Sequence, residues 1–146
     1  MNPPVRYKKD KEILWQRIKD GTIQCIATDH APHTLEAKAK GFPKAPSGMP
    51  GVETSLAVML THAKQGKCSI EDVVKWMSTN VADCYQMIGK GKLETGYDGD
   101  VILVDLENYA IVKDENSWTR VGWNPFRGKE LTGWTVLTIV DGIPVF

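Results

Sequence analysis

A short apolar run that ends in an aspartate is the sequence feature that most constrains the fold of this chain. The run is TIQCIAT, residues 22–28, and Asp29 follows it at the start of the motif DHAPH. Continuous apolar runs of this length are typical of strands that are buried on both faces of a parallel sheet. Such sheets occur in α/β folds, whose catalytic groups lie at the carboxyl ends of the strands. The run therefore predicts an α/β fold with Asp29 at a functional strand end.

Helical patterns surround this predicted strand. Apolar spacing, stop signals and a Ser69–Asp72 capping box predict helices over residues 10–21, 51–66, 69–78 and 80–89. The apolar face of the first helix is expected to comprise Ile13, Leu14, Trp15 and Ile18. Between the strand and the second helix, prolines and glycines predict an irregular loop over residues 34–51. Loops of this length inside compact domains are often functional.

The sequence changes character near residue 89. From there, turn signals alternate with β-branched runs, which is typical of strands. VILVDL is expected to form one strand, and LTGWTVLTIVDGIPVF a hairpin that turns at Asp141–Gly142. The chain is therefore predicted to have two parts. Residues 1–88 hold the helices and the apolar strand, and residues 89–146 hold the β-rich elements.

Charge and composition argue against several functional classes. The chain has 146 residues, enough for roughly one domain, and its 18 basic and 18 acidic residues give no net charge. Neither a nucleic acid nor a membrane is therefore expected as a partner, and no apolar stretch reaches the roughly 20 residues of a membrane span. The three cysteines do not suggest a disulfide framework, which fits a reducing cytoplasm, and Cys25 is expected to be a small buried filler.

Several residues near the strand end have metal-binding or proton-transfer chemistry. The Asp29 carboxylate suits a divalent metal and proton transfer, with capping of the following turn as an equally weighted alternative. His33, after the rigid Pro32, could bind an anionic group at a pocket mouth, although a lone histidine more often packs or lies on the surface. His62 is expected to be structural inside its helix. The glycines of APSGMPG, residues 45–51, would let backbone amides approach a ligand, with a plain surface loop as the alternative.

Five segments together resemble the C-terminal third of the bacterial-type (class I) dihydroorotases, which are cyclic amidohydrolases of the amidohydrolase superfamily. The segments are MNPPVR, IATDHAPHT, APSGMPGVETSLAVMLT, GYDGDVILVD and GWTVLTIVDG, in the order in which that family has them. The resemblance implies reversible hydrolysis of L-dihydroorotate to N-carbamoyl-L-aspartate, a step of pyrimidine biosynthesis. It also implies that the chain supplies the C-terminal portion of a (β/α)8 barrel and part of a small β-sandwich.

The resemblance assigns roles to five residues. Asp29 becomes the strand-end metal ligand and proton shuttle. Asn2 and His33 match residues that hold the substrate's carboxylate and ring, and Ser47 and Gly48 match the loop whose backbone meets the pyrimidine ring. The family's zinc centre, expected to be binuclear in the complete enzyme, needs a His-x-His pair and further ligands that this sequence lacks.

Much of the family's catalytic machinery is therefore expected to lie outside this chain, and His30 receives no role. The chain is interpreted as a fragment that is inactive alone and needs the missing N-terminal part. The other implied partners are a small-molecule substrate, further copies in a homo-oligomer and aspartate transcarbamoylase. One alternative is a non-catalytic, dihydroorotase-like scaffold domain. Another is a different cyclic amidase of the hydantoinase or allantoinase type, against which the DHAPH and MNPP motifs argue.

Overall fold

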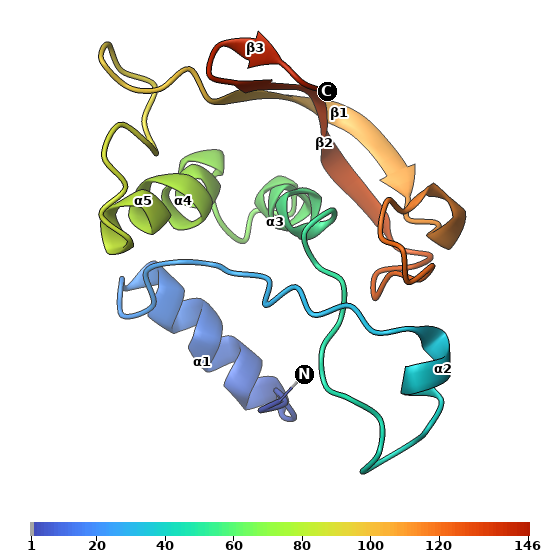
Figure 1. Ribbon diagram of the computed structural model, residues 1–146. Coiled ribbons are helices and arrows are strands. Elements are labelled where there is room, and N and C mark those ends of the chain that lie inside the picture. The colour runs from blue at the N-terminus through green and yellow to red at the C-terminus, as the bar shows by residue number, and fades with distance from the viewer. Residues whose placement is uncertain (1) are drawn as a thin grey trace.

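The fold places helices beneath a small antiparallel sheet. The computed structural model describes residues 2–146. In chain order its elements are α1 (Lys8–Lys19), α2 (Leu35–Lys38), α3 (Ser55–Lys64), α4 (Ile70–Val74), the π-helical turn η1 (Lys75–Thr79), α5 (Asn80–Cys84), β1 (Val101–Ile111), the 3-10 turn η2 (Asp114–Asn116), β2 (Glu130–Val140) and β3 (Ile143–Pro144). Figure 1 shows the sheet along the top, α3 beneath it with α4 and α5 beside it, and α1 at the bottom. Helices and strands are both present, as an α/β fold predicts.

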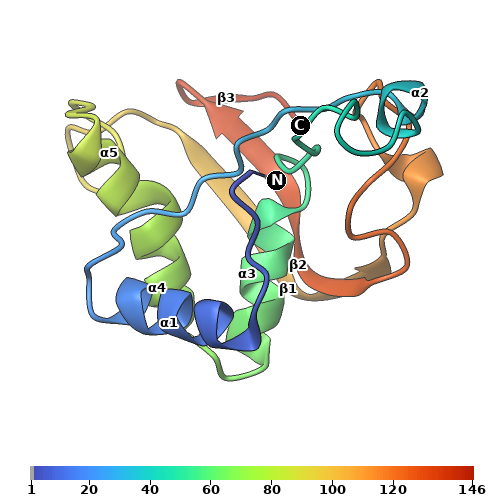
Figure 2. The same cartoon turned by 90° about the horizontal axis from the view of Figure 1, so that it is seen from below.

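An extended segment leaves the end of α1 and crosses the molecule to α2, as both views show (Figures 1 and 2). This segment contains residues 22–28, where a strand is predicted, but it has no strand partner within residues 2–146. The prediction of a paired strand is therefore wrong for this chain, because apolar sequence favours extended backbone but a ladder needs a neighbour. The segment is instead held by single contacts, among them the Ile26 N–H donating to the Trp76 carbonyl at 3.0 Å.

The first predicted helix is confirmed as α1, which ends just before Gly21 at a positive φ of 83°. Its predicted apolar face is only partly correct. Ile18 is buried and Trp15 half-buried, but Ile13 and Leu14 are 40% and 44% exposed. Leu14 lines an apolar cavity of about 310 Å³ between α1, the extended segment and α3. Leu14 therefore faces a side of α1 that is only loosely packed.

The predicted helices over 69–78 and 80–89 form one continuous helical stretch, α4–η1–α5. It begins with the predicted capping box, in which Ser69 Oγ accepts the Asp72 N–H at 3.0 Å and the Asp72 carboxylate accepts the Ser69 N–H at 2.9 Å. The π-helical turn η1 joins the two helices, and Trp76 within it is buried. The stretch ends at Cys84, earlier than expected, because Gln86 takes a left-handed conformation with φ 53°.

The main core lies where α1, α3 and the α4–η1–α5 stretch meet. Its buried members are Ile18, Met59, Leu60, Val73 and Trp76. A second, smaller core joins α3 to the sheet through Ala57, Val112 and Leu131. α3 belongs to both cores, so it is the element on which the rest of the fold is assembled.

The sheet confirms the predicted β-rich end of the chain. β1, β2 and β3 are antiparallel in the order β1-β2-β3, and the hairpin turns at Asp141–Gly142 with φ of 49° and 75°.

α3 is bonded to β2, because Thr61 Oγ1 accepts the Thr132 N–H at 2.9 Å. At Gly133, a Cβ would lie 2.7 Å from the Leu60 side chain. The sheet therefore packs so closely on α3 at this position that only glycine fits. The boundary between residues 88 and 89 stays a prediction.

Cysteine burial differs from the sequence expectation. Cys25, Cys68 and Cys84 are all free. Cys25 is not a buried filler: it is half-exposed, and its sulfur lies 3.4 Å from that of Cys84. The expectation failed because the extended segment has neighbours on fewer sides than a strand inside a sheet. Within residues 2–146, no helix combines the length and the apolar character that crossing a membrane requires.

Candidate active site

Asp29 lies where the extended segment turns toward α2. It has φ 44°, a left-handed conformation that aspartate and asparagine tolerate better than most residues. Its side chain is exposed, and no hydrogen bond joins its carboxylate to another group of residues 2–146. Capping of the following turn, the alternative role, would require such a bond. The carboxylate is thus available to a substrate or an external ligand.

His30 joins the end of the extended segment to the chain that leads into α3. Its Nδ1 accepts the Gly51 N–H at 3.1 Å and the Val52 N–H at 3.3 Å. Its backbone pairs with Met49 in an isolated parallel bridge, next to which the Ala31 N–H donates to the Met49 carbonyl at 3.1 Å. These bonds assign the remaining ring proton to Nε2. His30 is therefore an anchor, a role that no local spacing in the sequence could have indicated.

The bridge brings His33 next to the glycine loop. Gly48 has φ 115°, and a Cβ built there would lie 2.6 Å from the Ala31 carbonyl oxygen and 3.3 Å from His33 Nε2. A larger residue would therefore push the two segments apart. Ser47, which precedes this close contact, is exposed. The predicted loop over 34–51 is irregular except at α2, where Thr34 Oγ1 accepts the Ala37 N–H at 3.2 Å.

The prediction of no regular structure is thus wrong at α2, because the prolines and glycines of the loop begin only at Gly41. The remainder of the loop is tied down by polar contacts. Lys38 Nζ donates to the Pro46 carbonyl at 2.8 Å and lies 5.9 Å from the centre of the Trp123 ring. These contacts of Lys38 hold the loop against the rest of the chain, so it is not a plain surface loop.

Trp123 makes a second contact that the sequence did not indicate. Its indole Nε1 donates to the His33 carbonyl at 2.7 Å, across 90 positions of sequence. The β-rich part of the chain therefore helps to hold the backbone of His33. No motif links the two residues, so only their meeting in the fold reveals this role.

Four of the five predicted site residues thus lie along two facing segments, Asp29 to His33 and Ser47 to Gly48. Asn2 is exposed on the N-terminal segment before α1, and no hydrogen bond joins it to the other four within residues 2–146. His62 is structural, as expected: its ring stacks edge-on against Trp15 at 5.4 Å, and burial lowers its pKa.

These residues do not fit a metal centre by themselves. Within residues 2–146 there is no group of three or more histidine, cysteine, aspartate or glutamate side chains that could hold an ion. Catalytic zinc usually takes three protein ligands. The facing segments can bind anionic and polar groups through His33 and the loop, and the Asp29 carboxylate can move a proton. A metal would need ligands from elsewhere.

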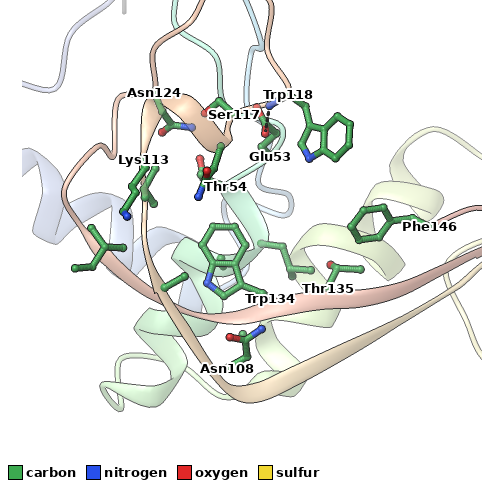
Figure 3. A pocket seen from close by; sticks show the side chains of 17 residues that line it. Glu53, Thr54, Asn108, Lys113, Ser117, Trp118, Asn124, Trp134, Thr135 and Phe146 are labelled. Carbon is green, nitrogen blue, oxygen red and sulfur yellow. Dashed lines mark hydrogen bonds between the residues drawn. The ribbon is translucent and has the colours of Figure 1, made fainter.

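A separate cavity lies between α3 and the sheet. Figure 3 shows this cavity of about 420 Å³, lined by side chains from the start of α3, from the segment after β1 and from the sheet. The Glu53 carboxylate fixes one wall by accepting the Trp118 N–H at 2.7 Å. The hydroxyl of Thr54 is buried there without a hydrogen-bond partner among the described residues. None of the five predicted site residues lines this cavity.

Comparisons with known proteins identify the relatives of this chain. The sequence profile of the Amidohydrolase family matches residues 6–145. A dihydroorotase from Anoxybacillus flavithermus is 40% identical over 144 residues, which cover 97% of this chain and 33% of that protein. A dihydroorotase from Pyrococcus horikoshii is 39% identical over 140 residues, covering 96% and 32%. The chain spans about a third of the length of the curated relatives it matches.

Solved structures show the same fold. A dihydropyrimidinase from Brevibacillus agri has a TM-score of 0.92 and 28% identity, with 99% of this chain and 32% of that chain covered. An L-hydantoinase from Arthrobacter aurescens has a TM-score of 0.92 and 34% identity, with 99% and 33% covered. The arrangement of helices, loop and sheet described above is therefore one that larger cyclic amidases contain.

Proposed function

The chain belongs to the Amidohydrolase family, and from this premise we propose that it forms one third of a dihydroorotase. In the complete enzyme it would take part in the reversible hydrolysis of L-dihydroorotate to N-carbamoyl-L-aspartate, in the cytoplasmic synthesis of pyrimidines. The observation that carries the proposal is the pairing of the Asp29–His33 segment with the Ser47–Gly48 loop. The identity of about 40% to dihydroorotases along nearly the whole chain supports it.

Each of the facing residues has a proposed task. Asp29 takes a proton from the attacking water and delivers it to the amide nitrogen that leaves when the ring opens. His33 donates a hydrogen bond to the substrate's carboxylate, and the backbone at Ser47 and Gly48 meets the ring. The lack of a Cβ at Gly48 lets this loop lie directly against Ala31 and His33. Asn2, on the N-terminal segment before α1, completes the carboxylate site.

The remaining two thirds of a dihydroorotase supply what these residues lack. We propose that they contribute the other strands of a (β/α)8 barrel, the zinc ligands and the rest of a β-sandwich. Exposed apolar side chains on β1 support this, among them Ile102, Leu103 and Tyr109. Such side chains normally lie against another layer. The isolated chain is therefore expected to be inactive, and aspartate transcarbamoylase and further copies of the enzyme are proposed partners of the whole protein.

A chimera tests this function. Residues 1–146 would replace the aligned third of the Anoxybacillus flavithermus relative, and hydrolysis of L-dihydroorotate would be followed together with zinc content. We expect turnover by the chimera and none by the isolated chain. Turnover of hydantoin or dihydrouracil without dihydroorotate would favour the second candidate, a hydantoinase-like amidase, which the structural similarity to dihydropyrimidinase and hydantoinase suggests. A folded, zinc-loaded chimera without any turnover would favour the scaffold role.

In the same chimera, His33→Ala should impair substrate use more than metal binding. Loss of one hydrogen bond to a charged carboxylate costs about 1.5–3 kcal/mol, which is about 10- to 150-fold in kcat/KM. Steady-state kinetics and zinc analysis of the purified variant measure both effects. His62→Ala is the matched control, because this histidine lies on α3 against Trp15. Loss of zinc together with activity in His33→Ala would mean that His33 is a metal ligand.

A further inference from the structure

Two thiols meet between the extended segment and the last helix. Cys25 lies in the segment, and Cys84 is the final residue of α5. Their sulfur atoms are 3.4 Å apart, although the residues are 59 positions apart in sequence. Cys25 is half-exposed and Cys84 exposed, so reagents in solution can reach the pair. Neither cysteine has a part in the proposed hydrolysis.

Two hydrogen bonds from α5 to Gln24, the residue before Cys25, hold the segment beside the pair. Asn80 Nδ2 donates to the Gln24 carbonyl at 2.7 Å, next to Cys25 in the chain. The Gln24 side-chain oxygen accepts from Cys84 Sγ at 3.3 Å. The segment is therefore fixed to α5 at the residue before Cys25 and again through the Cys84 thiol. These bonds hold the segment and α5 close together where the two sulfurs meet.

Cys68, the third cysteine, offers an internal comparison. Like Cys25, it is partly buried and free, but no other cysteine sulfur contacts it within residues 2–146. Burial, followed by the charge of Asp72, raises the pKa of its thiol. The raised pKa disfavours the thiolate, which is the reactive form, so we expect Cys68 to react slowly. The chain thus contains one paired and one solitary site for thiol chemistry.

We propose that Cys25 and Cys84 form a reversible oxidation site, at which a hydroperoxide converts the two thiols into a disulfide. The cross-link joins the segment that carries Asp29 to the end of α5. A disulfide requires a sulfur–sulfur distance of about 2.05 Å, so the two sulfurs must approach by little more than an ångström. The inference rests on the thiol geometry alone and is independent of the proposed function.

The chemistry balances with hydrogen peroxide as the oxidant. The Cys84 thiolate attacks one peroxide oxygen, the O–O bond breaks, and the sulfur becomes a sulfenic acid while the first water leaves. The Cys25 sulfur then attacks the Cys84 sulfur, the S–S bond forms, the S–O bond breaks, and the second water leaves. The two thiols lose two electrons and two protons, and one peroxide is reduced to two waters.

The environment favours this order of attack. Cys84 is the more exposed thiol and is reached first. The hydrogen bond to Cys84, followed by burial, raises the pKa of the Cys25 thiol, which disfavours Cys25 as the first attacking thiolate. Cys25 then acts as the resolving thiol, already in contact with the sulfur that it attacks.

The test uses the reduced 146-residue chain, freed of reductant and treated with hydrogen peroxide. Remaining thiols are blocked with N-ethylmaleimide, and the protein is digested without reduction for mass spectrometry. We expect the Cys25 and Cys84 thiols to disappear together, a mass loss of about 2 Da and one cross-linked peptide pair. Cys68 should still carry the maleimide, and dithiothreitol should restore both thiols.

Three controls make the result decisive. Cys68→Ser should leave the cross-link unchanged. Cys84→Ser should abolish it completely, with circular dichroism showing that the variant keeps the helical signal of the parent. In denaturing urea the same oxidation should instead favour Cys68–Cys84, which are closer in sequence and close the shorter loop. Equal cross-linking of all pairs in the folded chain, or oxidation of Cys68 before the other two, would overturn the proposal.

Discussion

Replacement of Asp29 by asparagine should lower kcat of the dihydroorotase chimera by about 10²- to 10⁴-fold, the usual contribution of a positioned acid–base group. The change removes the proton acceptor but keeps the size of the side chain. It also keeps the backbone, because asparagine tolerates the left-handed φ of 44° found at this position. An alanine at position 29 would add backbone strain at this φ, and its effect on kcat could not be separated from the loss of the carboxylate. Single-turnover and steady-state rates with dihydroorotate provide the measurement.

The control for this experiment is Asp83→Asn. Asp83 is an exposed carboxylate on α5, outside the facing segments of the site. Its replacement should leave kcat and zinc content at the values of the unmodified chimera. A near-normal kcat for Asp29→Asn would remove Asp29 from proton transfer. Complete loss of zinc in that variant would show instead that its main role is to bind the metal.

Trp76→Ala should cause the largest loss of stability in the 146-residue chain. Trp76 is only 3% exposed, and it packs in the core shared by α1, α3 and α4. Truncation of a buried tryptophan to alanine costs about 3–5 kcal/mol, through lost apolar burial and the cavity left behind. Since whole domains are stable by only about 5–15 kcal/mol, this variant should be largely unfolded or close to it. Urea unfolding followed by circular dichroism measures the free energy of unfolding.

Trp118→Ala is the matched control, because Trp118 is 82% exposed. Its backbone N–H donates to Glu53, and the substitution keeps that bond. Surface substitutions of this kind usually change the free energy of unfolding by less than about 0.5 kcal/mol. A loss below about 1 kcal/mol in Trp76→Ala would mean that the core around η1 does not support the fold.

Local patterns in the sequence identified most of the elements correctly. The capping box at Ser69, the stop at Gly21 and the hairpin turn at Asp141–Gly142 are encoded within a few residues, and all three are confirmed. The apolar run at 22–28 was misjudged for a different reason. Its composition encodes an extended conformation, whereas pairing depends on other strands, which are not among residues 2–146.

The candidate site was predictable where a motif carried it. Asp29, His33 and Gly48 came from short segments with recognisable chemistry, and the fold brings these segments face to face. His30 and Trp123 were not recognised as supports, because their partners are distant in sequence. Hydrogen bonds over such separations leave no periodic pattern. They become visible only when the backbone path is known.

The bond from Trp123 to the His33 carbonyl also limits how this chain can be recombined with its relatives. A crossover placed anywhere between positions 33 and 123 would take His33 from one parent. The residue at position 123 would then come from the other parent. Where the new partner lacks an N–H at that place, the His33 carbonyl would lose its 2.7 Å donor. Shuffled libraries of cyclic amidases should therefore yield more working clones when both residues come from the same parent.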